Sequence, residues 1–252
     1  MIGLVGALVT VLVLLGAWLL AVAGGVSPFV LPSPGAVGTA FGTLVRDPVT
    51  WRELGVTAVE VVGGFGIALV IGLVVGVLLG RLRWLEKAAR PALVALQVTP
   101  KVALVPIFVL WFGFGPTSKI VLAALLAFLP ITLNVLLGVR SVEPGHRDVL
   151  RELGAPRWAT LRSLDLPTAA PAVLTGAETA IVFAVIGAVV GEFLGGSAGL
   201  GHVVVVAMNA LDTPRLFAAI LLLALFGILL HGAIAGVRRL VVPWHGSVTD
   251  AA

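Results

Sequence analysis

The stretch "DVLRELGAPRWATLRSLDLP", residues 148–167, is a charged, amphipathic segment inside an otherwise apolar chain. Of the 252 residues, 60% are hydrophobic and only 11% are charged. Long runs without any charge exclude an ordinary soluble domain and indicate an integral membrane protein. A segment this polar is then expected outside the hydrocarbon, between two membrane spans.

Six apolar stretches are long enough to cross about 30 Å of hydrocarbon as helices that rise about 1.5 Å per residue. They cover residues 1–23, 56–80, 92–112, 120–139, 172–193 and 216–237. We therefore expect an all-α integral membrane protein with about six transmembrane helices in a single domain, residues 1–252. The first stretch is expected to be a retained helix. A cleaved signal peptide is the alternative, because residues 21–23 resemble a cleavage site, although no basic segment precedes the apolar run.

The distribution of cations predicts the orientation in the membrane. With a cytosolic N-terminus, the inside loops would hold most of the Lys and Arg residues, and the outside segments would hold only four. Lys101 falls within the third span. The inside residues are Arg81, Arg83, Lys87, Arg90, Arg140, Arg147, Arg151, Arg157, Arg162, Arg238 and Arg239, and the outside residues are Arg46, Arg52, Lys119 and Arg215. Because cytoplasmic loops carry excess Lys and Arg, both termini and residues 148–167 are expected in the cytosol. Topology and lipid headgroups explain the net charge of +4 better than nucleic acid does.

Small residues recur every four positions in the second span, at Gly64, Ala68, Gly72, Gly76 and Gly80. They share one helix face, where small side chains let another helix approach closely. Packing within the chain is the favoured interpretation, and a seam between two copies is the alternative.

The loop between the fourth and fifth spans, about residues 140–170, contains nine of the 28 charges. Gly154 interrupts it as a helix end, and Pro156 suits the first turn of a second helix. Apolar residues at helical spacing precede and follow this break, so two short amphipathic helices at an angle are predicted. The two apolar stripes are Val149, Leu150 and Leu153, then Trp158, Leu161 and Leu164.

The spacing in this loop resembles the cytoplasmic signature of ABC importer permeases, E-A-A-x3-G-x9-I-x-L-P. The matching positions are Asp148, Val149, Leu150, Gly154, Leu164, Leu166 and Pro167, with Asp for Glu, Val-Leu for Ala-Ala and Leu for Ile. Two further stretches, "TPKVALVPIFVLWFGFGPTSK" (residues 99–119) and "GEFLGGSAGLG" (residues 191–201), resemble the nitrate, sulfonate and taurine branch. This branch also includes permeases for thiamine-precursor pyrimidines and riboflavin.

The resemblance implies a type I importer of the cell inner membrane, in which this chain forms the solute path. Its partners would be a second permease copy, an extracytoplasmic solute-binding protein and a cytosolic ABC ATPase dimer. The loop would hold coupling helices that dock on the ATPase, through Asp148, Val149, Leu150, Arg151, Glu152, Gly154, Leu164, Leu166 and Pro167. The solute would be a small anion such as sulfonate, taurine or nitrate, or a thiamine-precursor pyrimidine or riboflavin.

The sequence lacks recognisable motifs for nucleotide binding, metal binding and catalysis. No G-x4-G-K-[ST] phosphate loop occurs, so ATP and Mg are expected on the partner ATPase and no cofactor on this chain. The four histidines lack ligand spacing, and neither a metal site nor an enzyme is expected. They are His146, His202, His231 and His245.

Ionisable groups at membrane depth are costly, so Glu60, Lys101, Glu178 and Glu192 are expected to face a cavity, an interface or each other. The candidate solute path contains Gln97, Lys101, Asn134, Glu178 and Glu192. Alternatively, Lys101 snorkels to the headgroups and Glu192 pairs with backbone near the outer surface.

Two other classes of protein remain as alternatives to the importer subunit. A secondary transporter would bind its solute and coupling ion in broken helices of inverted repeats, and no convincing repeat is present. A membrane scaffold would only bind a cytosolic partner through the loop. Solute uptake into vesicles separates the three classes. An importer subunit would require ATP and an ATPase, a secondary transporter would require an ion gradient alone, and a scaffold would give no uptake.

Overall fold

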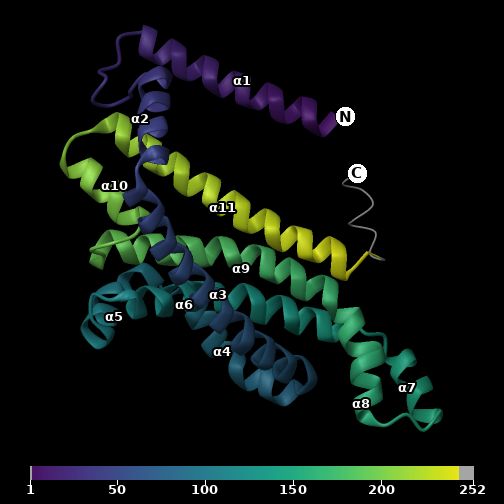
Figure 1. The fold of residues 1–252 in the computed structure, drawn as a ribbon. Helices are drawn as coiled ribbons and strands as arrows, with labels where there is room; N and C mark the ends of the chain where they lie inside the picture. The colour runs from purple at the N-terminus through teal and green to yellow at the C-terminus, as the bar shows by residue number, and fades with distance from the viewer. Residues whose placement is uncertain (1, 244–252) are drawn as a thin grey trace. The chain divides into compact units, whose positions relative to one another are not determined.

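The computed structural model describes residues 2–243, so Met1 and His245 lie outside the described residues. The described part consists of helices and connections without a strand, as predicted (Figure 1). The elements are α1 (Ile2–Ala23), α2 (Pro34–Arg46), α3 (Pro48–Arg81), α4 (Arg83–Val98), η1 (Lys101–Leu104), α5 (Val105–Phe112), α6 (Pro116–Arg140), α7 (Pro144–Glu152), α8 (Arg157–Thr160), η2 (Leu161–Asp165), α9 (Leu166–Gly195), α10 (Leu200–Asn209) and α11 (Thr213–Val241).

Within residues 2–243, four helical segments are long and apolar enough to cross a membrane: α3, α6, α9 with the turns before it, and α11. A fifth span results if α4 and the η1–α5 segment are counted together, although these two are bent by 86°. The sequence predicted one continuous helix here, at residues 92–112. Pro100 explains the break, because proline lacks the N–H that a helix needs and disfavours helical backbone at Thr99.

The chain divides into two compact units, and the first contains residues 1–56 and 198–225. Its core is formed by α2, α10 and the first part of α11, through Val37, Leu44, Val204, Ala218 and Ala219. Trp18 of α1 packs against this core, and its indole N–H donates to the Pro32 carbonyl at 2.9 Å. The Ser33 hydroxyl caps α2 by accepting from the Ala36 N–H, and Pro34 occupies the first turn.

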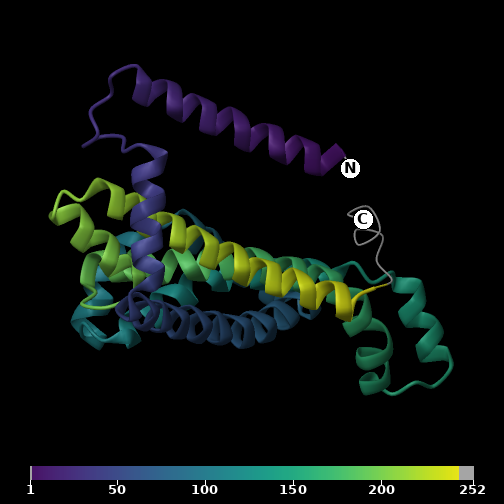
Figure 2. The ribbon, with the colours of Figure 1, turned by 45° about the horizontal axis from the view of Figure 1, so that its top comes forward.

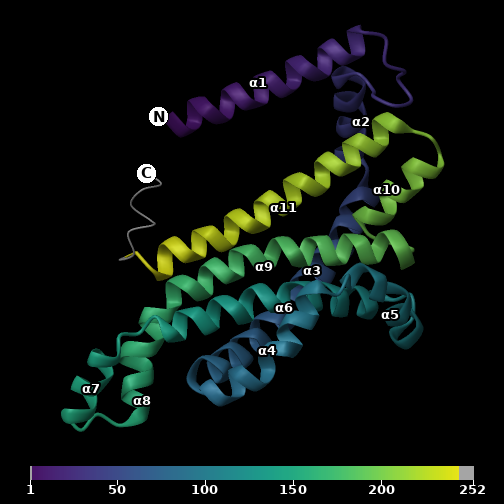
Figure 3. The ribbon, with the colours of Figure 1, turned by 180° about the vertical axis from the view of Figure 1, so that it is seen from behind.

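The second unit contains residues 57–197 and 226–252, and α6 and α9 run side by side within it (Figures 1 and 3). The two helices approach closely at glycines: a Cβ added to Gly187 would lie 2.6 Å from the Cα of Ala123. Helix α6 also packs against the part of α3 that belongs to this unit.

The small residues of α3 face α6, which confirms packing within the chain as their function. A Cβ added at any of the four glycines of the pattern would meet a side chain of α6 at less than 3 Å. The pairs are Gly64 with Ala123 at 2.5 Å, Gly72 with Ile131 at 2.8 Å, Gly76 with Val135 at 2.6 Å, and Gly80 with Val139 at 2.8 Å. Such contact supplies the dispersion energy that membrane helices need, because lipid offers no hydrophobic drive between them.

Candidate coupling loop and solute path

The loop between α6 and α9 contains one separate short helix, α7, and a second helical segment, which begins with α8 and continues through η2 into α9. The predicted second short helix is therefore the start of the long helix Trp158–Gly195, and α7 and α8 lie side by side in Figures 1 and 2. Helix α7 ends in a Schellman motif: the Gly154 N–H donates to the Arg151 carbonyl and the Ala155 N–H to the Leu150 carbonyl, both at 2.9 Å. This closure requires a left-handed residue, and Gly154 has φ +73°. The role predicted for Gly154 as the helix end is therefore confirmed.

The second half of the loop returns the chain to α9. After α8, residues Leu161–Asp165 form a single π-helical turn that continues directly into Leu166 and Pro167 of α9. Pro167 has no N–H to donate to the preceding turn, and the helix is π-helical directly before it. Leu164 and Pro167 are half-buried at this junction, and Leu166 is exposed.

The two short helices expose both charge and apolar surface. Asp148 and Arg151 pair loosely at 3.5 Å, and both are well exposed, as is Glu152. Val149, Leu153 and Trp158 are 56%, 76% and 66% exposed, although the sequence pattern placed them on apolar stripes. Leu150 is half-buried. The described chain therefore leaves three apolar side chains, Val149, Leu153 and Trp158, exposed among charged residues of the loop.

Both ends of the loop are fastened to the point where α3 turns into α4. Arg81, the last residue of α3, donates to the Asp165 carboxylate at 2.6 Å. Arg140, the last residue of α6, reaches the Leu79 and Gly80 carbonyls at 3.3 and 3.5 Å and the Glu86 carboxylate at 3.3 Å. Sequence reasoning missed these contacts, because pairs 54 to 84 positions apart leave no local pattern.

Two candidate solute-path residues, Gln97 and Lys101, lie on opposite sides of the break between α4 and η1. Gln97 is exposed in the last turn of α4, and Lys101 is half-buried at the start of η1. The Thr99 hydroxyl donates to the Ala95 carbonyl at 2.7 Å, which satisfies one carbonyl of the last turn of α4. Broken helices at membrane depth are sites where transporters bind solutes.

Asn134 and Glu178 lie elsewhere and have partners within the chain. The Asn134 amide donates to the Pro130 carbonyl at 2.8 Å, and its side chain packs against Gly176 of α9. Glu178 lies 3.1 Å from the guanidinium of Arg238 on α11. The five candidates are thus distributed over several helices and joined to different neighbours.

Glu192 belongs to a buried polar cluster that joins α3, α6 and α9. Its carboxylate accepts from the Thr57 hydroxyl at 2.6 Å, and the Glu60 carboxyl is in hydrogen-bonding contact with it. Lys119 is close enough to interact electrostatically with both carboxyls, and its ammonium donates to the Phe114 and Gly115 carbonyls. Glu60, Lys119 and Glu192 are at most 3% exposed, so the ammonium offsets the cost of burying acidic groups. The expectation that membrane-depth acids face each other is confirmed for Glu60 and Glu192, whereas the burial of Lys119 was not foreseen.

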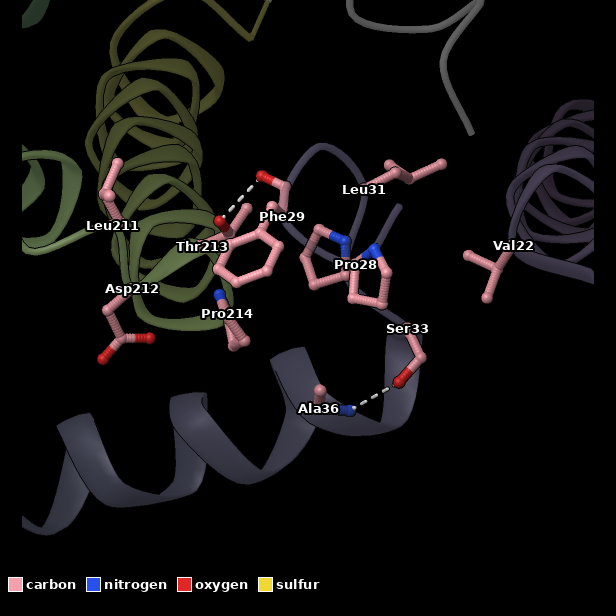
Figure 4. Close-up of a pocket in the computed structure, with 11 residues that line it drawn as sticks. Val22, Pro28, Phe29, Leu31, Ser33, Ala36, Leu211, Asp212, Thr213 and Pro214 are labelled. Atoms are coloured by element: carbon pink, nitrogen blue, oxygen red, sulfur yellow. Dashed lines mark hydrogen bonds between the residues drawn. The ribbon is translucent and has the colours of Figure 1, made fainter. Parts of the chain in front are cut away.

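The first unit contains an apolar cavity of about 300 Å³ between the α1–α2 connection and the α10–α11 turn. Figure 4 shows Phe29 lying against Thr213 and Pro214, with the Thr213 hydroxyl donating to the Phe29 carbonyl at 2.9 Å. Asp212, at the rim, caps α11 by accepting from the Arg215 N–H. Leu211 completes the turn with φ +55°, an uncommon conformation for a residue other than glycine.

Comparison with known proteins identifies relatives over nearly the whole chain. The riboflavin transport system permease protein of Chloroflexus aurantiacus is 39% identical over 95% of this chain and 90% of its own. The formylaminopyrimidine transport permease protein of Halalkalibacterium halodurans is 36% identical, with 86% of each chain covered. A putative aliphatic sulfonates transport permease protein of Bacillus subtilis is 32% identical over 89% of this chain and 81% of its own.

Solved structures share the fold. A chain of the inward-facing MetNI methionine ABC transporter matches with a TM-score of 0.66 at 21% identity, covering 77% of this chain and 98% of its own. Residues 68–242 match the family described as binding-protein-dependent transport system inner membrane component. The chain therefore belongs to this family and is a multi-pass permease subunit of an ABC importer, a transport protein and not an enzyme.

Proposed function

We propose that this permease couples solute import to a separate cytosolic ATPase pair through the loop of α7, α8 and η2. The observation that supports this proposal most directly is the exposure of three apolar side chains of the loop, Val149, Leu153 and Trp158, together with the exposed charges of Asp148, Arg151 and Glu152. Apolar side chains amid charges suit a groove on a protein partner, where the apolar groups are desolvated and the charges set the register. ATP and Mg would be bound by that partner, and both termini of this chain would lie on the same cytosolic side, as the cation distribution predicts.

Charge reversal at the loop tests this contact. Asp148→Lys combined with Glu152→Lys should reduce recovery of the ATPase with the tagged permease, while Arg52→Glu, an exposed reversal at the opposite end of α3, should not. Recovery undiminished by the double reversal would refute the assignment of the loop as the ATPase contact.

A second copy of the permease is proposed to complete the solute path. In the single chain, Gln97 is exposed and Lys101 only half-buried at the break of the third span. The neighbouring α5 region leaves Leu110, Trp111 and Phe114 69% to 81% exposed. A homodimer would enclose these groups between two identical breaks, with Asn134, Glu178 and Glu192 on the helices behind them. Cross-linking of paired copies through a single cysteine at residue 97 would support this arrangement.

The solute is proposed to be a heterocycle of the flavin or pyrimidine type. Support comes from the relatives at 39% and 36% identity, which are named for riboflavin and formylaminopyrimidine, against 32% for the sulfonate permease. The solute would be delivered by an extracytoplasmic binding protein. Riboflavin, formylaminopyrimidine and taurine should each be added to that protein, and only a heterocycle is expected to raise its melting temperature. Stabilisation by taurine alone would refute the proposal.

Uptake by the reconstituted importer tests the energy source. Vesicles containing permease, ATPase and binding protein should accumulate solute only with internal ATP and Mg. Accumulation driven by an ion gradient without ATP would contradict coupling to the ATPase.

A further inference from the structure

Residues 141–164 of the loop are flanked by two contacts that involve arginines. Both contacts are made to the same short segment of the chain. This segment, residues 79–86, is the corner where α3 ends and α4 begins. Arg140 immediately precedes the loop and Asp165 immediately follows it, and both contact the corner. The loop is thus held at both of its ends by the same few residues.

The contact at the second end joins a buried carboxylate to an arginine whose side chain is 39% exposed. Asp165 is only 4% exposed and lies in a narrow cleft of about 30 Å³ whose apolar lining includes Val77, Val139 and Leu166. A carboxylate in such surroundings is costly without a partner, and the Arg81 guanidinium supplies that partner at 2.6 Å. Movement of the junction between η2 and α9 would therefore pull on the end of α3.

The contact at the first end uses backbone as well as charge. The last carbonyls of α3 lack helical donors, and the Arg140 guanidinium donates to two of them, on Leu79 and Gly80. A cation also suits the negative end of the helix dipole. The same guanidinium contacts Glu86 in the first turn of α4, so Arg140 joins the ends of α6, α3 and α4.

We propose that Arg81 and Arg140 are positioning residues that transmit displacement of the loop to α4 and thereby to the break at residues 99–100. The inference rests on the proposed function, in which the loop contacts the ATPase. Helix α4 leads from the corner directly to Gln97 in its last turn. A rotation of the corner would therefore reorient Gln97 and, beyond the break, Lys101.

A labelling experiment tests this transmission without knowledge of the solute. The chain has no cysteine, so Gln97→Cys provides a single reactive thiol. Its rate of modification by a maleimide is measured in the permease–ATPase complex, with and without trapping by ATP and vanadate. The background is then changed to Arg81→Asp, to Asp165→Arg, to both together, and to the conservative Arg81→Lys.

We expect trapping to change the labelling rate in the parent complex, and each single reversal to reduce that change by about fivefold or more. The double reversal and Arg81→Lys should restore at least part of it, which a mere loss of folding would not allow. Co-purification of the ATPase should persist in all of these variants, in contrast to the Asp148 and Glu152 reversals. Transmission is refuted if trapping does not change the labelling rate in the parent complex, or if the single reversals retain the full change in rate. It is also refuted if the double reversal recovers none of that change while Arg81→Lys retains it. Failure of the parent to bind the ATPase would instead refute the proposed function.

Discussion

Replacing Gly154 by valine separates the conformational requirement of the loop from its side-chain contacts. Gly154 has φ +73°, and a Cβ built on it would meet nothing within 4 Å. The cost of substitution therefore comes from the left-handed backbone alone, about 1 to 2 kcal/mol for a residue with a Cβ. This lowers the population of the Schellman-closed loop by a factor of roughly 5 to 30 relative to open forms. Asparagine should cost less, because it tolerates this conformation better.

The assay is ATP hydrolysis by the reconstituted complex, with and without stimulation by the solute-loaded binding protein. Gly154→Val should reduce stimulation by about fivefold or more, Gly154→Asn by less, with equal amounts of permease in the membrane. Gly145→Val is the matched control, because Gly145 lies in helix α7 of the same loop and an added Cβ there also meets nothing within 4 Å. It should leave stimulation unchanged. Full stimulation in Gly154→Val, or an equal loss in Gly145→Val, would show that the left-handed turn is not required.

Three further substitutions test packing, the buried cluster and the solute path. Gly76→Ile forces a side chain against Val135, because an added Cβ would lie 2.6 Å from the Cβ of Val135, and should lower the stability of the fold by about 1 to 3 kcal/mol. The control is Gly66→Ile, where a Cβ meets nothing within 4 Å, and the melting temperature in detergent should be lower for Gly76→Ile than for this control. Lys119→Met leaves the Phe114 and Gly115 carbonyls without their donor and removes a positive charge near Glu60 and Glu192. It should destabilise the protein by about 1 to 3 kcal/mol in the same assay, and an unchanged melting temperature would show that the ammonium does not stabilise this cluster. Lys101→Met, at a half-buried position, should leave the melting temperature nearly unchanged but reduce solute uptake, and normal uptake would exclude Lys101 from the path.

Features set by local spacing could be predicted from the sequence. The helix end at Gly154 follows from glycine's tolerance of positive φ, and the four-residue repeat of small residues in α3 follows from the geometry of one helix face. The sequence did not say which helix that face meets, but the structure identifies it as α6. Pro100 carried the signal for the break in the third span, yet hydropathy alone merged the two halves into one span.

Contacts between distant positions could not be predicted. Glu60, Lys119 and Glu192 lie on three different helices, and only the packing of those helices brings their charges together. The ion pair between Arg81 and Asp165 depends in the same way on how the loop rejoins α9. The charge pattern indicated that buried acids needed partners, but it did not identify those partners.

The most direct measurement is a cross-link between the loop and the ATPase. Because the chain contains no cysteine, Val149→Cys introduces one thiol, at a position 56% exposed on α7. A maleimide that carries a photoreactive benzophenone is attached to this thiol in membranes that contain both proteins. Irradiation should join it to C–H bonds of the ATPase, whereas Val26→Cys, in the connection between α1 and α2, should give no such product. Absence of the cross-link from residue 149, with the ATPase still bound to the permease, would contradict coupling through this loop.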